Sequence, residues 1–168
     1  MRKIPSVLSI NTLAETLVTL AREKKITFGT AESCTGGMIS AAVTGVSGAS
    51  AVFYGGVVSY DNSVKRRLLG VKEETLSTVG AVSPETAKEM SMGATKALSV
   101  DFAVSVTGIA GPGGGTPTKP VGLVYLSTAS KNGVIAVKEN RFDGNRGEIR
   151  LQSVEAALTM LIHAIEQC

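Results

Sequence analysis

The chain has 168 residues, of which 43% are hydrophobic and 4% aromatic, and it contains 19 glycines. This length and composition predict a single α/β domain with a well-filled core and exclude the disordered and fibrous classes. The net charge of +3 comes from scattered basic residues, with Lys65-Arg66-Arg67 the only triplet, so an enzyme of a phosphorylated metabolite explains it as well as a nucleic-acid partner does.

The first predicted elements are an amphipathic helix and a short buried strand. Ser6 can cap a helix that runs to about residue 22, because apolar residues recur there at three- and four-residue steps. Residues 26–30 then have the pattern of a buried strand. This strand delivers the chain to a polar, glycine-containing loop.

That loop is TAESCTGG (residues 30–37), the stretch around which the chain is organised. Its two glycines permit a tight turn, and residues 38–43 have helical character, so Ser33, Cys34 and Thr35 are expected at a helix N-terminus. Unpaired N–H groups gather there, which suits a nucleophile that creates an oxyanion and equally an anion-binding loop. The alternative is that Ser33 or Thr35 only caps the helix.

The next segments predict a strand followed by a basic helix. Residues 52–60 are rich in β-forming residues, and Gly55-Gly56 within them indicates a bulge or a close backbone contact. Asp61 and its neighbours have capping chemistry for a helix that Gly70 stops. Lys65 therefore falls in the first turn of this helix.

The second half of the chain repeats the alternation of helix and strand. Pro84 begins a helix to about residue 98, and a buried strand follows at 101–106. It opens into TGIAGPGGG (residues 107–115), where glycine lets backbone approach a ligand, although a flexible surface loop is the alternative. A hairpin around Asn132-Gly133 and a final amphipathic helix after residue 146 complete the prediction.

Several kinds of chemistry are poorly supported by the residues present. His163 is the one histidine and lies near the end of the final helix, so a Ser-His-Asp triad is disfavoured. The sequence has no metal-ligand spacing and no phosphate-binding loop of the Walker type. We therefore expect neither a metal nor a cofactor.

What remains is hydroxyl chemistry with a lysine base, for which Ser33, Tyr60 and Lys65 are available. A lysine acts as a base only when its pKa falls toward neutrality, which burial and the adjacent charges of Arg66 and Arg67 could both cause. The alternatives are a solvated helix lysine at position 65 and a core tyrosine at position 60.

Two residues beside Ser33 also have alternative interpretations. Cys34 could be a rival nucleophile, but a cysteine beside a helix start is more often a small buried filler. Glu32 is either a structural carboxylate at the end of a strand or a group that faces a cationic substrate.

Several motifs along the chain resemble one known family. The chain is similar to the CinA C-terminal domain family, the stand-alone nicotinamide-nucleotide amidases, over nearly its whole length. The resemblance rests on AESCTGG (31–37), GVVSY (56–60) with Asn62 and Lys65, GAVS (80–83), TGIAGP (107–112) with Gly114-Gly115, and KPVG (119–122).

The resemblance implies a reaction and a fold. The reaction is hydrolysis of the carboxamide of nicotinamide mononucleotide to nicotinate mononucleotide and ammonia, without a cofactor. Ser33 would be the nucleophile, Lys65 its general base, and Tyr60 a hydroxyl that supports the pair. The family fold is a three-layer α/β/α sandwich around a mixed β-sheet.

The substrate contacts are expected to come from two loops and one arginine. Backbone N–H groups of the first loop would stabilise the oxyanion, Glu32 would favour the pyridinium charge, and the second loop with Arg146 would hold the phosphate. Where the family has Gly-Asp-Arg before the last helix, this chain has Asn145, which can also cap a helix. The expected substrate-binding residues are Glu32, Cys34, Thr35, Gly36, Gly37, Thr107, Gly108, Ile109, Ala110, Gly111 and Arg146.

The remaining expectations concern location and partners. The sequence shows neither a signal peptide nor a run of about 18 apolar residues, and its two cysteines fit a reducing cytoplasm. We expect no membrane and no nucleic-acid partner, and a homo-oligomer, most simply a dimer. The alternatives to an amidase are a non-catalytic protein that binds pyridine nucleotides and an accessory protein of competence or DNA-damage responses.

Overall fold

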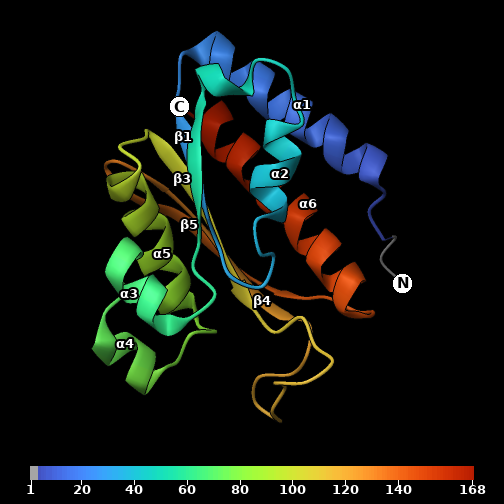
Figure 1. Cartoon of the computed structure of the whole chain (residues 1–168), viewed down its shortest axis with the longest axis vertical. Helices are drawn as coiled ribbons and strands as arrows, with labels where there is room; N and C mark the ends of the chain where they lie inside the picture. Colours follow the sequence, from blue (N-terminus) through green and yellow to red (C-terminus); the bar gives the residue numbers. More distant parts are fainter. Residues whose placement is uncertain (1–3) are drawn as a thin grey trace.

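The protein, described here by a computed structural model of residues 4–168, is built in three layers. A five-stranded sheet lies between α1, α2 and α6 on one face and α3, α4 and α5 on the other (Figure 1). The basic residues Arg2 and Lys3 lie outside the described residues. The elements are α1 Val7–Lys24, β1 Phe28–Glu32, α2 Met38–Thr44, the 3₁₀ turn η1 Ala49–Ala51, β2 Phe53–Val58, α3 Asn62–Leu69, α4 Glu73–Thr78, α5 Pro84–Ala97, β3 Phe102–Gly108, β4 Leu123–Ser130, β5 Gly133–Arg141 and α6 Arg146–Glu166.

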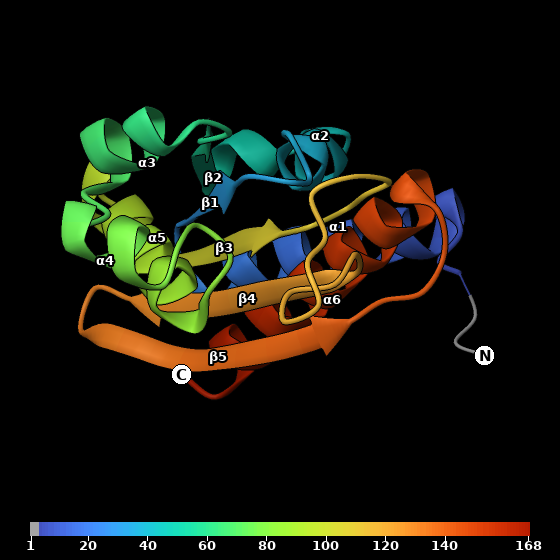
Figure 2. The ribbon, with the colours of Figure 1, turned by 90° about the horizontal axis from the view of Figure 1, so that it is seen from below.

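The sheet is mixed, with strand order β2-β1-β3-β4-β5 (Figure 2). β1 is parallel to both of its neighbours, β2 and β3, whereas β4 is antiparallel to both of its neighbours, β3 and β5. The carboxyl ends of β1, β2 and β3 therefore meet at one edge, where open α/β sheets bind their ligands. This arrangement confirms the predicted α/β sandwich and brings three separate loops together.

Local capping chemistry explains where the helices begin and end. Ser6, Asp61 and Ser83 each accept a hydrogen bond from a backbone N–H in the first turn of α1, α3 and α5. Gly70 ends α3 in the left-handed conformation with φ of 66°. These boundaries agree with the sequence predictions, whereas the short helix α4 was not predicted because it has no buried residue to give it an apolar period.

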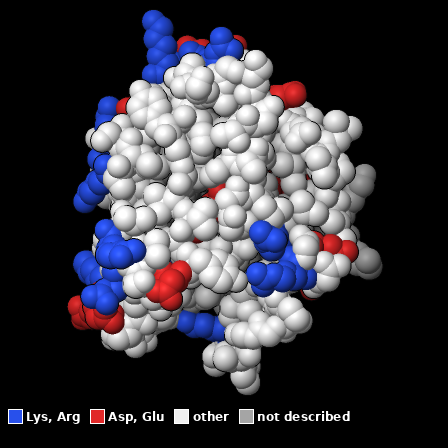
Figure 3. Space-filling view, viewed as in Figure 1, with Lys and Arg blue, Asp and Glu red and all other residues white. Residues whose placement is uncertain are grey.

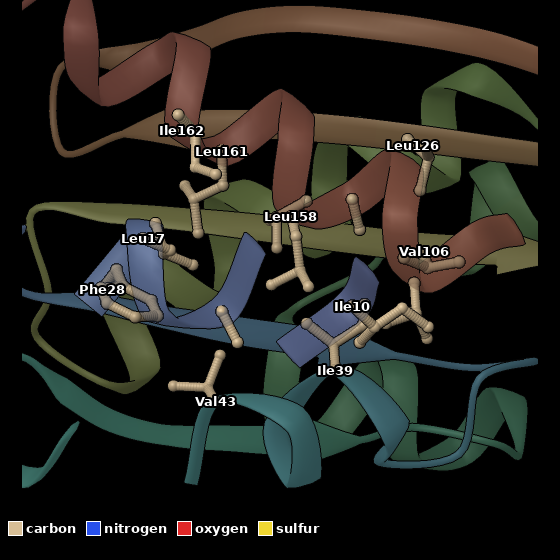
Figure 4. Close-up of a cluster of buried hydrophobic side chains, with 14 of the residues drawn as sticks. Ile10, Leu17, Phe28, Ile39, Val43, Val106, Leu126, Leu158, Leu161 and Ile162 are labelled. Carbon is tan, nitrogen blue, oxygen red and sulfur yellow. The ribbon is translucent and has the colours of Figure 1, made fainter. Parts of the chain in front are cut away.

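The main core lies between the sheet and the layer formed by α1, α2 and α6. Aliphatic side chains from all three helices meet Phe28 of β1 and Val106 of β3 there (Figure 4). Gly56 of β2 leaves room on the same face, because a Cβ at that position would collide with the hydroxyls of Ser40 and Thr30. The pairing of β1 with β2 shifts register between Phe53 and Gly55, which confirms the bulge predicted at this glycine pair. The close contacts at Gly56 are with side-chain hydroxyls, and they let α2 pack directly on the strand edge.

Within residues 4–168, no helix is both long and apolar enough to cross a bilayer. His163 is exposed on α6, as expected for a surface histidine. The described residues also contain no group of three or more His, Cys, Asp or Glu side chains arranged to hold a metal ion.

Candidate active site

The loop after β1 carries Ser33 at the carboxyl edge of the sheet. The Ser33 N–H donates to the carbonyl of Val106 at 3.0 Å, so Ser33 is tied to the end of β3. Its own carbonyl accepts from Gly36 N–H at 3.1 Å, which closes a tight turn. The helix α2 then begins at Met38, with Gly37 as its N-cap at φ of 96°. Ser33 and Thr35 are therefore not the caps of this helix, and both of their side chains remain in the loop.

The N-cap residue Gly37 has no side chain, and the first N–H groups of α2 are instead capped by the side chain of Glu32. This corrects the expectation that Glu32 faces the substrate. The Glu32 carboxylate is completely buried and accepts from three backbone N–H groups, those of residues 37, 39 and 40, at 2.9–3.1 Å. The Ser40 hydroxyl adds a fourth hydrogen bond at 2.8 Å. Because the carboxylate occupies the positive end of the helix dipole, that end is not available to a substrate anion. Glu32 is a structural carboxylate.

Lys65 reaches Ser33 from across the sheet edge. It lies in the first turn of α3, where Asp61 begins the helix at the carboxyl end of β2. Its Nζ donates to Ser33 Oγ at 3.1 Å, to the Ser59 carbonyl at 2.6 Å and to the Tyr60 carbonyl at 3.2 Å. The side chain is only 1% exposed, so it is not the solvated helix lysine of the alternative interpretation.

Burial lowers the pKa of Lys65 below its ordinary value of 10.5, because removal from water disfavours the charged amine. The negative charge of Asp61 opposes this shift, as Cys34 would in its thiolate form. Arg66, which the sequence suggested as a cause, instead forms an exposed ion pair with Glu73. Desolvation, and not a neighbouring positive charge, therefore favours the neutral amine.

The partners of the Lys65 amine define where its lone pair points when it is neutral. A neutral amine has two N–H donors and one acceptor lone pair, and a carbonyl oxygen can only accept. The carbonyls of Ser59 and Tyr60 therefore take the two N–H groups. The lone pair is left for the hydroxyl proton of Ser33, which is the geometry of a base and its nucleophile.

Tyr60 contributes to this arrangement through its backbone and not through its phenol. Its side chain is 63% exposed, and its hydroxyl accepts a hydrogen bond from Arg146 at 3.2 Å. The core tyrosine of the alternative interpretation is thus wrong, and the only hydrogen bond of the phenol among residues 4–168 is with Arg146 and not with the Ser33–Lys65 pair.

Cys34 is buried beside Ser33 but is poorly suited to be the nucleophile. Burial raises the pKa of its thiol to about 11, chiefly by desolvation, which a hydrogen bond to its own backbone and the charge of Arg150 only partly offset. A thiol with this pKa is almost entirely protonated at neutral pH, and only the thiolate is a strong nucleophile. Cys34 also belongs to the main hydrophobic core, as the filler interpretation predicts.

Most amides of the Ser33 loop are already used inside the protein. Gly36 N–H binds the Ser33 carbonyl, and Gly37 N–H binds the Glu32 carboxylate. Within residues 4–168, the N–H groups of Cys34 and Thr35 donate to no backbone or side-chain oxygen. The expected set of oxyanion donors is therefore narrowed to these two residues.

The loop after β3 is partly structural. The Thr107 hydroxyl donates to the Ala81 carbonyl at 2.6 Å, and Ile109 pairs with Leu123 through its N–H at 2.9 Å. Gly108 lies against β4, with no room for a Cβ beside Val124. The side chain of Thr107 and the N–H of Ile109 are therefore occupied.

Ala110 and Gly111 differ from the rest of this loop. Both residues are buried, and in the described part of the chain their N–H groups have no hydrogen-bond acceptor. Arg146 donates to the Gly111 carbonyl at 2.8 Å and to the Tyr60 hydroxyl, so it joins the loops that follow β2 and β3. Arg146 is exposed and retains unused donors.

Sequence reasoning missed Arg150, which contacts the Ser33 loop directly. Its Nε donates to the Cys34 carbonyl at 3.1 Å and its Nη2 donates to the Thr35 carbonyl at 2.9 Å. The only available signal was the spacing of four residues from Arg146, which puts both arginines on one face of α6. In the view of Figure 3, lysines and arginines lie in separate small groups and form no continuous basic face.

A large hollow elsewhere in the described residues does not contain Ser33. It has a volume of about 1050 Å³ and lies between α1, α6 and β5. Its lining is mostly apolar, and it has neither a nucleophile with a base nor the arginines of the Ser33 loop. The chemical arrangement at Ser33, and not cavity size, therefore identifies the candidate active site.

Comparison with known proteins agrees with this fold and these motifs. The CinA C-terminal domain model matches residues 10–165. A CinA-like protein from Leptospira borgpetersenii is 53% identical over 153 residues, which are 91% of this chain and 37% of the relative, and one from Kosmotoga olearia is 48% identical with the same coverage. The chain thus spans little more than a third of the length of these curated relatives.

Solved structures give the same result. The competence/damage inducible protein CihA from Agrobacterium tumefaciens has a TM-score of 0.92 and 49% identity, with 99% of this chain and 100% of that chain covered. A CinA superfamily protein from Klebsiella pneumoniae has a TM-score of 0.90 and 30% identity, with 95% and 99% covered. The chain therefore belongs to the CinA C-terminal domain family.

Proposed function

We propose that this protein is an amidohydrolase that converts nicotinamide mononucleotide to nicotinate mononucleotide and ammonia. The reaction and substrate come from the family resemblance of the sequence motifs. The observation that carries the proposal is the 3.1 Å contact between Lys65 Nζ and Ser33 Oγ, in which the two other partners of the amine are carbonyl oxygens. An amine buried in this way is suited to remove a proton from a serine hydroxyl.

In the proposed reaction, neutral Lys65 takes the Ser33 proton as Oγ attacks the carboxamide carbon. The tetrahedral intermediate collapses when the C–N bond breaks, and the protonated amine of Lys65 supplies the proton with which ammonia leaves. Water, deprotonated by the same amine, then hydrolyses the nicotinoyl-serine ester. The products are nicotinate mononucleotide and free Ser33, and no step requires a metal.

The developing oxyanion would be bound by the N–H groups of Cys34 and Thr35, which donate to no oxygen within residues 4–168. A nucleophile at the end of a strand commonly uses the amide of the following residue in this way. Preorganised donors of this kind typically contribute about 10²–10³-fold to kcat. The second loop supplies a comparable pair in Ala110 and Gly111, and with Arg146 these amides are our proposed phosphate ligands.

The test is an ammonia-release assay with purified wild type, Ser33→Ala and Lys65→Met on nicotinamide mononucleotide, nicotinamide riboside and nicotinamide. We expect ammonia from the mononucleotide with the wild type only, and weaker turnover of substrates without the phosphate. Saturable binding of the mononucleotide without ammonia from the wild type would instead indicate a non-catalytic binding protein. Ammonia at the wild-type rate from folded Ser33→Ala would refute the nucleophile.

A further inference from the structure

We propose that Arg150 is a positioning residue that orients the peptide group between Cys34 and Thr35, so that the Thr35 N–H is directed at the reacting carbonyl. The proposal rests on the proposed amidase function, because it assigns Arg150 a part in the chemistry at Ser33. Arg150 would touch neither the substrate nor the serine. It would act only through the loop.

The guanidinium of Arg150 holds two consecutive carbonyls of the loop. Nε binds the Cys34 carbonyl at 3.1 Å and Nη2 binds the Thr35 carbonyl at 2.9 Å. The planar guanidinium fixes both donor directions together, so a rotation of either peptide group breaks a hydrogen bond. A single hydrogen bond from a lysine would not impose this constraint.

The helix that carries Arg150 is itself firmly placed. Asn145 and Glu148 form a reciprocal capping box at the start of α6, one turn before Arg150. Ile149, the neighbour of Arg150, is buried in the main core. The guanidinium therefore projects from a fixed support, and its effect on the loop does not depend on a mobile segment.

Peptide geometry converts this contact into a direction for the Thr35 N–H. In a planar trans peptide, the C=O of one residue and the N–H of the next point in opposite directions. Because the Cys34 carbonyl points at Arg150, the Thr35 N–H points away from it. The positive charge beside the carbonyl also polarises this peptide group and strengthens its N–H as a donor.

Two unsatisfied groups on Thr35 indicate that this side of the loop is built for a ligand. The Thr35 N–H has no acceptor within residues 4–168. The Thr35 hydroxyl, on a fully buried residue, likewise has no hydrogen-bond partner among the described residues. Buried polar groups are normally satisfied, so two unpaired donors on one residue, two positions from the nucleophile, are suited to bind a substrate oxygen.

The test compares Arg150→Ala and Arg150→Lys with Arg141→Lys, a control at an exposed arginine of β5. For Arg150→Ala we expect kcat for ammonia release to fall about 100-fold, while KM changes less than about threefold, because an oxyanion donor acts mainly in the transition state. Arg150→Lys should be intermediate, the control should match the wild type, and added guanidinium ion at non-denaturing concentration should restore part of the kcat of Arg150→Ala. Thermal unfolding of each variant shows whether the protein is folded.

A second readout does not depend on the identity of the substrate. A fluorophosphonate, whose P–F bond is displaced by Ser33 Oγ with release of fluoride, also needs stabilisation of a developing phosphonyl oxyanion. Its labelling rate should fall in Arg150→Ala in parallel with kcat. Wild type that is labelled but releases no ammonia would refute the substrate, while the labelling rates still test Arg150. Wild type that neither reacts nor releases ammonia would refute both proposals.

Three results would overturn the role of Arg150. The first is a folded Arg150→Ala with kcat within threefold of the wild type. The second is a rise in KM at unchanged kcat, which would make Arg150 a substrate ligand. The third is a fall in kcat that follows the unfolded fraction alone and is not restored by guanidinium, which would make the contact merely structural. Should Arg150→Ala not fold, Arg150→Lys carries the same comparison.

Discussion

Replacing Lys65 with methionine removes the proposed base and keeps most of the buried volume. The side chain is almost completely enclosed, so methionine can fill the space that the aliphatic part of the lysine occupies. The change deletes the contact to Ser33 Oγ and the two hydrogen bonds to the carbonyls of Ser59 and Tyr60. It therefore tests the chemistry and the packing separately.

The expected magnitudes differ for activity and stability. Loss of a positioned base typically lowers the rate about 10²–10⁴-fold, which corresponds to about 2.7–5.5 kcal/mol of transition-state free energy. Two carbonyls left without a donor cost about 1–3 kcal/mol each, and removal of a buried amine offsets part of that cost. We expect the unfolding free energy to fall by about 2–4 kcal/mol, which leaves a typical domain folded.

The pH dependence follows from the lowered pKa of Lys65. The base must be neutral, so kcat/KM of the wild type should fall toward acid, with its midpoint below 10.5. For stability, the unfolded chain keeps the lysine proton up to about 10.5 while the folded protein loses it earlier, so the unfolding free energy should rise with pH between these two values. Lys65→Met should lack this rise.

The assay is ammonia release across pH, with urea unfolding of the same samples. Lys65→Arg is the informative companion, because arginine keeps the positive charge but does not deprotonate, and it should be as inactive as Lys65→Met. Lys72→Met, at an exposed lysine, is the matched control and should behave as the wild type. A folded Lys65→Met with more than a tenth of the wild-type rate, or a wild-type rate that stays flat into acid, would refute the lysine base.

The remaining predictions concern three neighbours of Ser33 and Lys65. Tyr60→Phe should lower kcat less than about tenfold, because the phenol contacts Arg146 and not the Ser33–Lys65 pair. Steady-state kinetics measure this, and a loss of kcat as large as that of Lys65→Met would contradict it. Glu32→Gln should lower the unfolding free energy by about 2–3 kcal/mol, because charge-assisted hydrogen bonds to the start of α2 are lost. Chemical denaturation measures this change, and an unchanged unfolding free energy would contradict the capping role of Glu32. Cys34→Ala should retain most of its turnover, because burial keeps the thiol protonated, and abolished turnover in a folded variant would restore Cys34 as a candidate nucleophile.

Much of the fold could be predicted because its boundaries depend on local chemistry. Ser6, Asp61 and Asn145 cap their helices with their own side chains, and Gly70 ends α3 because glycine readily adopts the left-handed conformation found there. The hairpin between β4 and β5 forms where it was predicted, but Ser130 pairs with Gly133, so the two loop residues are Lys131 and Asn132 and not the predicted Asn-Gly pair. The sequence did not predict α4, because a short helix without a buried face shows no periodic spacing of hydrophobic residues.

The roles of side chains at the candidate site were less predictable than the elements that carry them. Glu32 could face either a substrate or a helix end, and only the packing of α2 against β1 decides for the helix. Tyr60 and Lys65 were both singled out, but the position of α3 makes the tyrosine exposed and the lysine buried. A residue type and its spacing do not specify the direction of a side chain.

By itself, the sequence determined the alternation of helices and strands, the caps, and the presence of a serine, a lysine and two glycine-rich loops at the ends of predicted elements. The strand order and register decided what those residues contact. They bring Lys65 to Ser33, which is 32 positions away, and Arg150 to the carbonyl of Cys34, which is 116 positions away. Desolvation of the Lys65 amine is also a property of the assembled layers, because it requires protein on every side of the group.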